Sequence, residues 1–213
     1  MQKTIEAKEF NLDKVFGDDF LFEIPDYQRP YSWTTEETGE LLDDLIQAMG
    51  DNTPINQVPA YFLGSIVLIK DHGRAPSEVV DGQQRLTTLT ILLCALRELA
   101  SSHDEKQNLD EYIRERGNVF SGTMERYRLS LRPRDQDFFR ENIQQANVMA
   151  DAVWHDTAGL PDAKKNMLAN ARVIYEQLEK MTPEQRRRLA AFMVQQCYLV
   201  VVSAADHESA YRI

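Results

Sequence analysis

Residues 79–89 read Val79-Val80-Asp81-Gly82-Gln83-Gln84-Arg85-Leu86-Thr87-Thr88-Leu89. The valines predict the end of a strand, Asp81-Gly82 predicts a turn, and the residues from Gln83 onward predict the first turn of a helix. At such a junction the unpaired amides of the first helical turn point outward, and the helix dipole favours negative charge. The stretch therefore predicts a strand-turn-helix unit that can gather an anion.

Three residues of this stretch suit phosphate chemistry. Arg85 can offer a forked pair of donors to phosphate oxygens, and Gly82 lets a ligand approach the backbone. Asp81 is suited to holding Mg²⁺ or orienting a water, because this hard cation prefers oxygen ligands beside phosphates. A structural alternative stays open, since Asp81 and Gln84 also fit a capping box and Arg85 could pair with an acidic neighbour.

The flanking segments predict the elements around this unit. Residues 83–100 carry leucines at intervals of three and four with other apolar residues between them, which predicts a helix buried nearly all round. The β-prone run 61–69 predicts a mostly buried strand, and residues 20–24 predict another. Thr34 with Glu37 forms a capping box for an amphipathic helix that ends before Gly50.

The loop 25–33, between that first strand and the capped helix, is rich in side chains that can bind a ligand. Within the seven positions 27–33 it carries three aromatic rings, an amide and a guanidinium, those of Tyr27, Gln28, Arg29, Tyr31 and Trp33. Binding residues concentrate in loops held by a rigid scaffold. The alternative is that Tyr31 and Trp33 only fasten the loop to the core beside the Thr34 cap.

The second half of the chain predicts mainly helices. Residues 101–118 are strongly polar, which makes a domain boundary near 100–120 plausible, and helical patterns follow at 135–153, 163–181 and 183–197. The apolar run 198–202 predicts a strand. Asp206 fits the N-cap of a helix, but the sequence ends seven residues later, before such a helix could complete two turns. We therefore expect the sequence to be cut from a longer protein.

Composition restricts where the protein works and what it binds. The 213 residues carry 34 Asp and Glu against 24 Lys and Arg, a net charge of −10, which argues against a protein that coats DNA through bulk electrostatics. We expect a cytoplasmic protein with no membrane partner, because no export signal or apolar span is present and the isolated Cys94 and Cys197 suggest buried thiols.

Two groups of arginines invite a DNA-binding interpretation. As a strand, residues 126–134 would place four guanidinium groups on one face, those of Arg126, Arg128, Arg132 and Arg134, although a solvated face is favoured over contact with a DNA backbone. The run Arg186-Arg187-Arg188 lies in an expected helix, so its side chains should point in different directions and form helix surface.

Three segments together resemble one known family. They are Ile24-Pro25-Asp26-Tyr27-Gln28-Arg29-Pro30-Tyr31-Ser32-Trp33, Phe62-Leu63-Gly64-Ser65-Ile66-Val67-Leu68 and the stretch from Asp81 to Leu89. In order and spacing they resemble the N-terminal, GmrS-like domain of the GmrSD-type restriction endonucleases, specifically over residues 1–100 and more weakly over 101–213. The resemblance implies an α+β fold with a ParB/sulfiredoxin-like core at 1–105 and a mainly helical region at 106–213, in a modification-dependent phage-defence protein.

The resemblance also implies a nucleotide chemistry. In that family the Asp-Gly-Gln-Gln-Arg motif is associated with binding and hydrolysing nucleoside triphosphates, and it matches Asp81 to Arg85. We therefore expect a nucleoside triphosphate with Mg²⁺ at Gly82, Gln83, Gln84 and Arg85, with Asp81 and Arg85 as catalytic residues and Asp81 as metal ligand. Gln28 and Arg29 would close the site from the loop, and no Walker loop is present.

The remaining expectations concern DNA. Tyr27, Tyr31 and Trp33 are candidates for stacking on a nucleobase or on a modified base in DNA. Relatives carry their nuclease in a C-terminal domain, so we expect no cleavage by this chain and a nuclease domain or subunit as partner. Two alternatives stay open: a ParB-like module that binds nucleotide or modified DNA as a switch without hydrolysis, and a scaffold in which the motif only caps the core helix.

Overall fold

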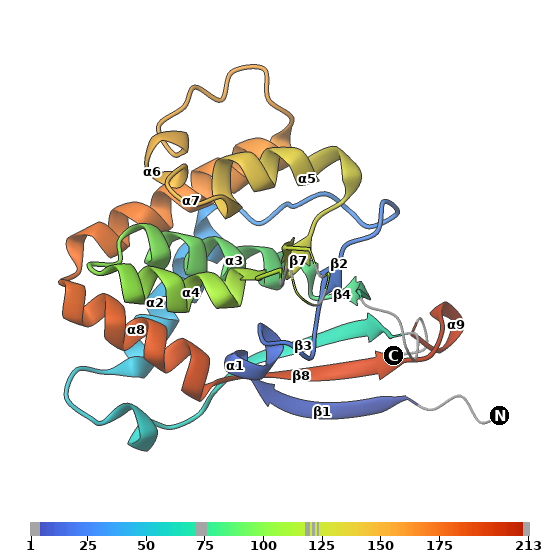
Figure 1. The fold of residues 1–213 in the computed structure, drawn as a ribbon, viewed down its shortest axis with the longest axis horizontal. Coiled ribbons are helices and arrows are strands. Elements are labelled where there is room, and N and C mark those ends of the chain that lie inside the picture. The colour runs from blue at the N-terminus through green and yellow to red at the C-terminus, as the bar shows by residue number, and fades with distance from the viewer. Residues whose placement is uncertain (1–4, 71–75, 118–119, 121, 123, 211–213) are drawn as a thin grey trace.

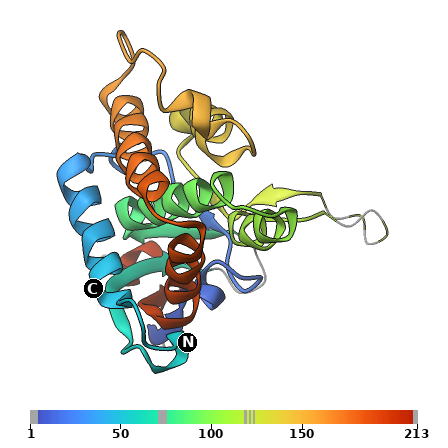
Figure 2. The ribbon, with the colours of Figure 1, turned by 90° about the vertical axis from the view of Figure 1, so that its left-hand side faces the viewer.

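In a computed structural model of the chain, a mixed sheet carries most of the helices on one face (Figures 1 and 2). The structure describes residues 5–70, 76–117, 120, 122 and 124–210. The strands are β1 (Glu6–Asn11), β2 (Phe22–Glu23), β3 (Tyr61–Ile69), β4 (Ser77–Asp81), β5 (Arg114–Glu115), β6 (Arg126–Tyr127), β7 (Leu129–Ser130) and β8 (Cys197–Ala204). The α-helices are α1 (Leu12–Val15), α2 (Thr35–Met49), α3 (Gln83–Glu98), α4 (His103–Ile113), α5 (Pro133–Phe139), α6 (Met149–Ala152), α7 (Asp162–Lys180), α8 (Pro183–Gln196) and α9 (His207–Ala210). A 3-10 turn spans Ile55–Gln57 and a π-helical turn spans Arg140–Gln144.

The sheet joins the two ends of the sequence. Its strand order is β1-β8-β3-β4-β2-β7, with β8 parallel to β3 and antiparallel to β1. Strand β3 runs antiparallel to β4, and Asp81 at the end of β4 pairs with Val67 of β3, two residues before α3 begins. The mixture of parallel and antiparallel strands with helices confirms the expected α+β class.

Helix α3 lies at the centre of the core. Every residue from Leu86 to Arg97 is buried, which confirms the helix that the leucine pattern predicts. One hydrophobic cluster runs from Leu12 to Val201 and joins residues on both sides of the expected boundary at 105–106. A smaller cluster on the opposite face of the sheet contains Val67, Ala204 and Ala210, where α9 packs on the strands.

The other elements near the site also follow the sequence. Helix α2 begins at the expected capping box of Thr34 and Glu37, and Gly50 ends it with a φ of 54°. Asp206 accepts from the amide of Ser209 at 2.9 Å at the start of α9, as an N-cap does. Residues 199–213 resemble a later strand of the family and the start of the helix that follows it; of these, 211–213 lie outside the described residues.

The helical pattern expected over 135–153 does form helical turns, but not one continuous helix. Its place is taken by α5, the π-helical turn and α6, and Asn147 between them has a φ of 62°. The buried guanidinium of Arg97 donates to the carbonyls of Gln144 and Gln145, both at 2.8 Å. These carbonyls bind a side chain of α3 instead of continuing a helix, and Gln145 is extended.

The prediction that residues 126–134 form one strand with a row of arginines on one face is wrong. The segment divides into β6, β7 and α5, and each of the four arginines pairs with a different acid, namely Arg126 with Glu115, Arg128 with Asp18, Arg132 with Asp135 and Arg134 with Asp26. The run 186–188 does point in different directions. Arg186 and Arg188 donate to carbonyls at the ends of α7 and α2, while Arg187 pairs with Glu105.

Both cysteines are free and buried, as expected. Burial raises the pKa of the Cys94 and Cys197 thiols to about 12, so both stay protonated at neutral pH. Among the described residues, no helix combines the length and apolar character that crossing a bilayer requires.

Candidate functional site

The first turn of α3 is left uncapped by side chains. Its N-cap is Gly82, which makes no side-chain cap and has a φ of 90°. The alternative in which Asp81 and Gln84 form a capping box is therefore wrong, because the cap position falls on a residue without a side chain. The amides of Gln83, Gln84 and Arg85 start the helix, at the positive end of its dipole.

Gly82 has a packing reason in addition to its conformation. A Cβ at this position would lie 2.4 Å from Cγ2 of Ile66 on β3. The bare side of the glycine is thus occupied by a neighbouring strand, so a ligand cannot approach there. Any anion has to approach the helix terminus from the side of the amides.

Arg85 lies against strand β3. Its Nη1 donates to the carbonyl of Ser65 at 3.3 Å, and its guanidinium atoms lie 3.0–3.1 Å from where a Cβ on Gly64 would be. Gly64 therefore provides the space in which this side chain rests. Desolvation lowers the pKa of Arg85, while the nearby charge of Asp81 acts in the opposite direction. A guanidinium remains protonated despite such a shift.

Gln84 binds the loop 25–33 rather than open space. Its Oε1 accepts from the amides of Ser32 at 2.7 Å and Trp33 at 3.2 Å, and its Nε2 donates to the carbonyl of Pro30 at 3.1 Å. The side chain predicted to bind nucleotide is thus used to hold the loop on α3. Only the backbone amide of Gln84 is left to face a ligand.

Tyr31 and Trp33 fasten the same loop to the core. Tyr31 is 6% exposed, and its hydroxyl shares a hydrogen bond with Thr88 Oγ1 at 2.8 Å. Desolvation raises the pKa of Tyr31. Trp33 is half-buried and packs against the core cluster. Tyr31 therefore matches the alternative in which it only fastens the loop to the core. Its ring has no exposed face on which a base could stack.

The first half of the loop reaches the end of β4. Gln28 donates to the carbonyl of Val80 at 2.8 Å, next to Asp81. Tyr27 is 52% exposed and donates to the carboxylate of Glu78, with its ring edge-on to His207. The loop and the strand-turn-helix unit are thus adjacent, as the hypothesis of a site closed from the loop requires.

Arg29 and Gln83 line the same small cavity. Its volume is about 10 Å³, room for about one water. Gln83 is 6% exposed, and its side-chain amide has no hydrogen-bond partner among the described residues. Arg29 is exposed and, like Asp81 and Arg85, pairs with no acid or base in the part of the chain that the structure describes.

Two residues that hold the loop have no signal in the sequence. Asn170 of α7 donates to the hydroxyl of Tyr31 at 2.7 Å and to the carbonyl of Trp33 at 2.8 Å. Arg132 donates to the carbonyl of Gln28 at 3.2 Å. Both lie more than 100 positions from the loop residues that they contact, so only the fold brings them together.

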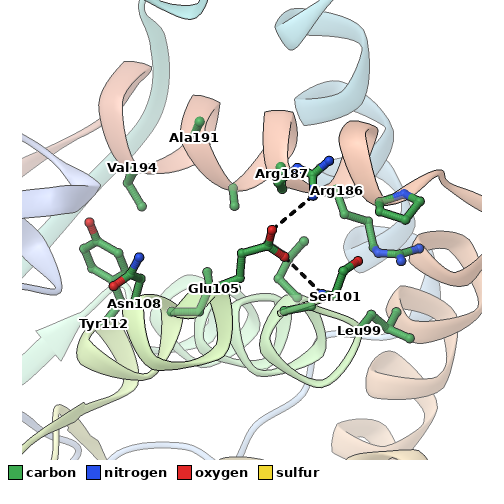
Figure 3. A pocket seen from close by; sticks show the side chains of 14 residues that line it. Leu99, Ser101, Glu105, Asn108, Tyr112, Arg186, Arg187, Ala191 and Val194 are labelled. Atoms are coloured by element: carbon green, nitrogen blue, oxygen red, sulfur yellow. Dashed lines mark hydrogen bonds and ion pairs between the residues drawn. The ribbon is translucent and has the colours of Figure 1, made fainter. Parts of the chain in front are cut away.

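A separate groove lies between α8 on one side and α4 with the end of α3 on the other (Figure 3). Its volume is about 270 Å³, and Leu99, Ala191 and Val194 supply part of its apolar lining. Glu105 points across it and pairs with Arg187 at 3.0 Å (Figure 3). None of the residues predicted to bind nucleotide contributes to this groove.

Comparison with known proteins identifies the family. A search among curated proteins gives no match. The model of the GmrSD restriction endonuclease N-terminal domain matches residues 11–213, which include the loop 25–33, strand β3 and the Asp81–Arg85 unit. Because this match covers nearly the whole chain, the chain belongs to the GmrSD restriction endonuclease family, in which residues 11–213 correspond to the N-terminal domain.

Proposed function

We propose that this domain binds and hydrolyses nucleoside triphosphates and acts as the sensor of a modification-dependent restriction protein. The observation that carries the proposal is the uncapped start of α3, around which Arg29, Asp81 and Arg85 lack ion-pair partners among the described residues. Charged side chains left unpaired beside a helix N-terminus are suited to a phosphate ligand.

The phosphates would bind between the loop and the helix. The amides of Gln83, Gln84 and Arg85 supply donors fixed by the helix, and the amide of the Gln83 side chain supplies another that has no partner among the described residues. Arg85 on one side and Arg29 on the other add positive charge. Donors held in place before the reaction stabilise charge that develops on a transferred phosphoryl group.

Asp81 fits the role of metal ligand or water-orienting residue. It is exposed at the end of β4, directly before the helix N-terminus. The described residues contain no group of three or more His, Cys, Asp and Glu placed to hold a metal ion. Mg²⁺ would thus be held by Asp81 together with phosphate oxygens and water, an arrangement that this ion accepts. A bound Mg²⁺ would neutralise phosphate charge.

The cavity between Arg29 and Gln83 is too small for a triphosphate, so the phosphates would lie at its mouth. Arg29 is exposed and can turn toward them without disturbing the core. Tyr27, which is half exposed beside the site, remains a candidate contact for a nucleobase or for modified DNA. In this proposal DNA cutting belongs to a nuclease domain or subunit that acts with this domain.

Asp81→Asn should separate catalysis from stability. We expect nucleotide turnover to fall about 100-fold or more, as expected when a group that acts on the attacking water is removed. The free energy of unfolding should change by less than about 0.5 kcal/mol, because Asp81 is exposed and caps nothing. Phosphate release and urea unfolding measure the two quantities.

Asp51→Asn is the matched control, since Asp51 is exposed and lies in the loop after α2, away from the site. Turnover should be unchanged in this variant. Nucleotide binding by the wild type without any turnover would refute the hydrolysis proposed here and favour the non-catalytic switch. Equal turnover by Asp81→Asn and the wild type would exclude Asp81 from the reaction.

A further inference from the structure

The loop 25–33 is held on both sides of Arg29 by residues of the helical region. On one side Arg132 donates to the carbonyl of Gln28 at 3.2 Å, and its own position is fixed by Asp135. On the other side Asn170 binds Tyr31 and Trp33. Arg29 and Pro30 therefore lie between two anchors that belong to segments after residue 130.

The side chain of Asn170 is polar and fully buried, which lowers the stability of the fold unless all its polar atoms are hydrogen-bonded. It is 0% exposed, and its Oδ1 has no hydrogen-bond partner among the described residues. A buried polar atom without a partner costs free energy, so packing alone would favour an apolar residue here. What Asn170 contributes is two donated bonds to a loop from the opposite part of the fold.

We infer that Asn170 is a positioning residue that holds Arg29 in place for the phosphates and so couples helix α7 to the nucleotide site. This inference rests on the proposed function and adds a route for its regulation. With the loop anchored, Arg29 binds without first ordering its backbone, whereas a loosened loop would have to be ordered on binding. A displacement of α7 would thus weaken nucleotide binding without contact between α7 and the nucleotide.

A double-mutant cycle of Asn170→Leu and Arg29→Ala tests this coupling. The probe is whichever of ATP, GTP, CTP and UTP the wild type binds most tightly, with Mg²⁺, in calorimetric titration. We expect Arg29→Ala to weaken binding about 10-fold and Asn170→Leu about 5-fold, as expected for a lost charge-assisted bond and a lost anchor. The double variant should bind no more weakly than Arg29→Ala alone, because the anchor acts only through Arg29.

Asn142→Leu is the matched control. Asn142, which is half-buried, also donates to a carbonyl, that of Phe138 at 2.8 Å, but within its own helical turn and away from the loop. Its replacement should leave nucleotide binding unchanged. Tyr31→Phe gives a second, milder variant, which removes one bond of Asn170 and keeps the ring. Thermal unfolding shows that each variant is folded.

Amide hydrogen exchange measures the anchor without nucleotide. Exchange at Ser32 and Trp33, whose amides donate to Gln84, should become faster in Asn170→Leu and stay unchanged in Asn142→Leu. Unchanged exchange, unchanged binding or additive effects in the cycle would each overturn the inference. A wild type that binds no nucleotide would instead overturn the proposed function and the coupling with it.

Discussion

Gly82→Ala is expected to destabilise the protein by about 3 kcal/mol or more, the combined cost of a strained backbone and a forced contact in the core. The φ of 90° at this residue is one that side chains with a Cβ rarely adopt. The added methyl group would also lie 2.4 Å from Cγ2 of Ile66, which is 0% exposed and cannot move into solvent. Urea unfolding measures the change in free energy.

Gly39→Ala is the control for this substitution. Gly39 lies within α2, and a Cβ there would meet nothing within 4 Å. Alanine should stabilise the helix by about 0.5–1 kcal/mol, since glycine has the lower helix propensity. If Gly82→Ala were as stable as Gly39→Ala, the turn between β4 and α3 would have to differ from the one described.

Arg85→Ala is expected to weaken nucleotide binding about 100-fold, since each tenfold change corresponds to about 1.4 kcal/mol and a forked, charge-assisted contact is among the strongest in proteins. The fold should survive, because Arg85 has no ion-pair partner among the described residues and makes one bond of 3.3 Å, to the carbonyl of Ser65. Calorimetric titration with Mg²⁺ and nucleotide measures the loss.

Two further variants define what Arg85 contributes. Arg85→Lys keeps the charge but not the forked geometry, so its affinity should lie between those of Arg85→Ala and the wild type. Arg187→Ala removes an exposed arginine of α8 that lines the separate groove, and nucleotide affinity should be unchanged. Equal affinities for Arg85→Ala and Arg187→Ala would exclude Arg85 from the site.

Elements with a strong local pattern could be predicted from the sequence. The leucine spacing of α3, the capping box of α2 and the β-prone run of β3 each placed an element within a few residues of its observed bounds. These segments either face the core on a regular period or carry a side chain that fixes an end. For these segments the local sequence pattern was sufficient to predict the helix or strand.

Elements that depend on distant partners were missed. Strand β1 exposes its first four residues and gains its partner only from β8, near the other end of the sequence, so it shows no alternation of apolar residues. Helix α4 lies in the polar segment that suggested a domain boundary. The break between α5 and α6 follows from the buried guanidinium of Arg97, a contact that no local pattern reveals.

The candidate site divides in the same way. The chemistry of Asp81, Gln83 and Arg85 follows from residue type and from the helix start. The role of Gln84 does not, because its amide meets the loop only in the folded chain. Asn170 and Arg132 each contact a loop residue more than 100 positions away in the sequence. The sequence therefore indicated which groups are candidates to bind phosphate, whereas the structure shows what holds them in place.

Titration of the ¹⁵N-labelled chain with Mg²⁺ and each of ATP, GTP, CTP and UTP, followed by amide NMR, tests the central claim most directly. The account predicts that at least one nucleotide shifts the amide resonances of Gln83, Gln84 and Arg85 more than those of any other segment. Nucleotide-induced shifts confined to other elements, or none with any of the four nucleotides, would contradict a phosphate site at the start of α3.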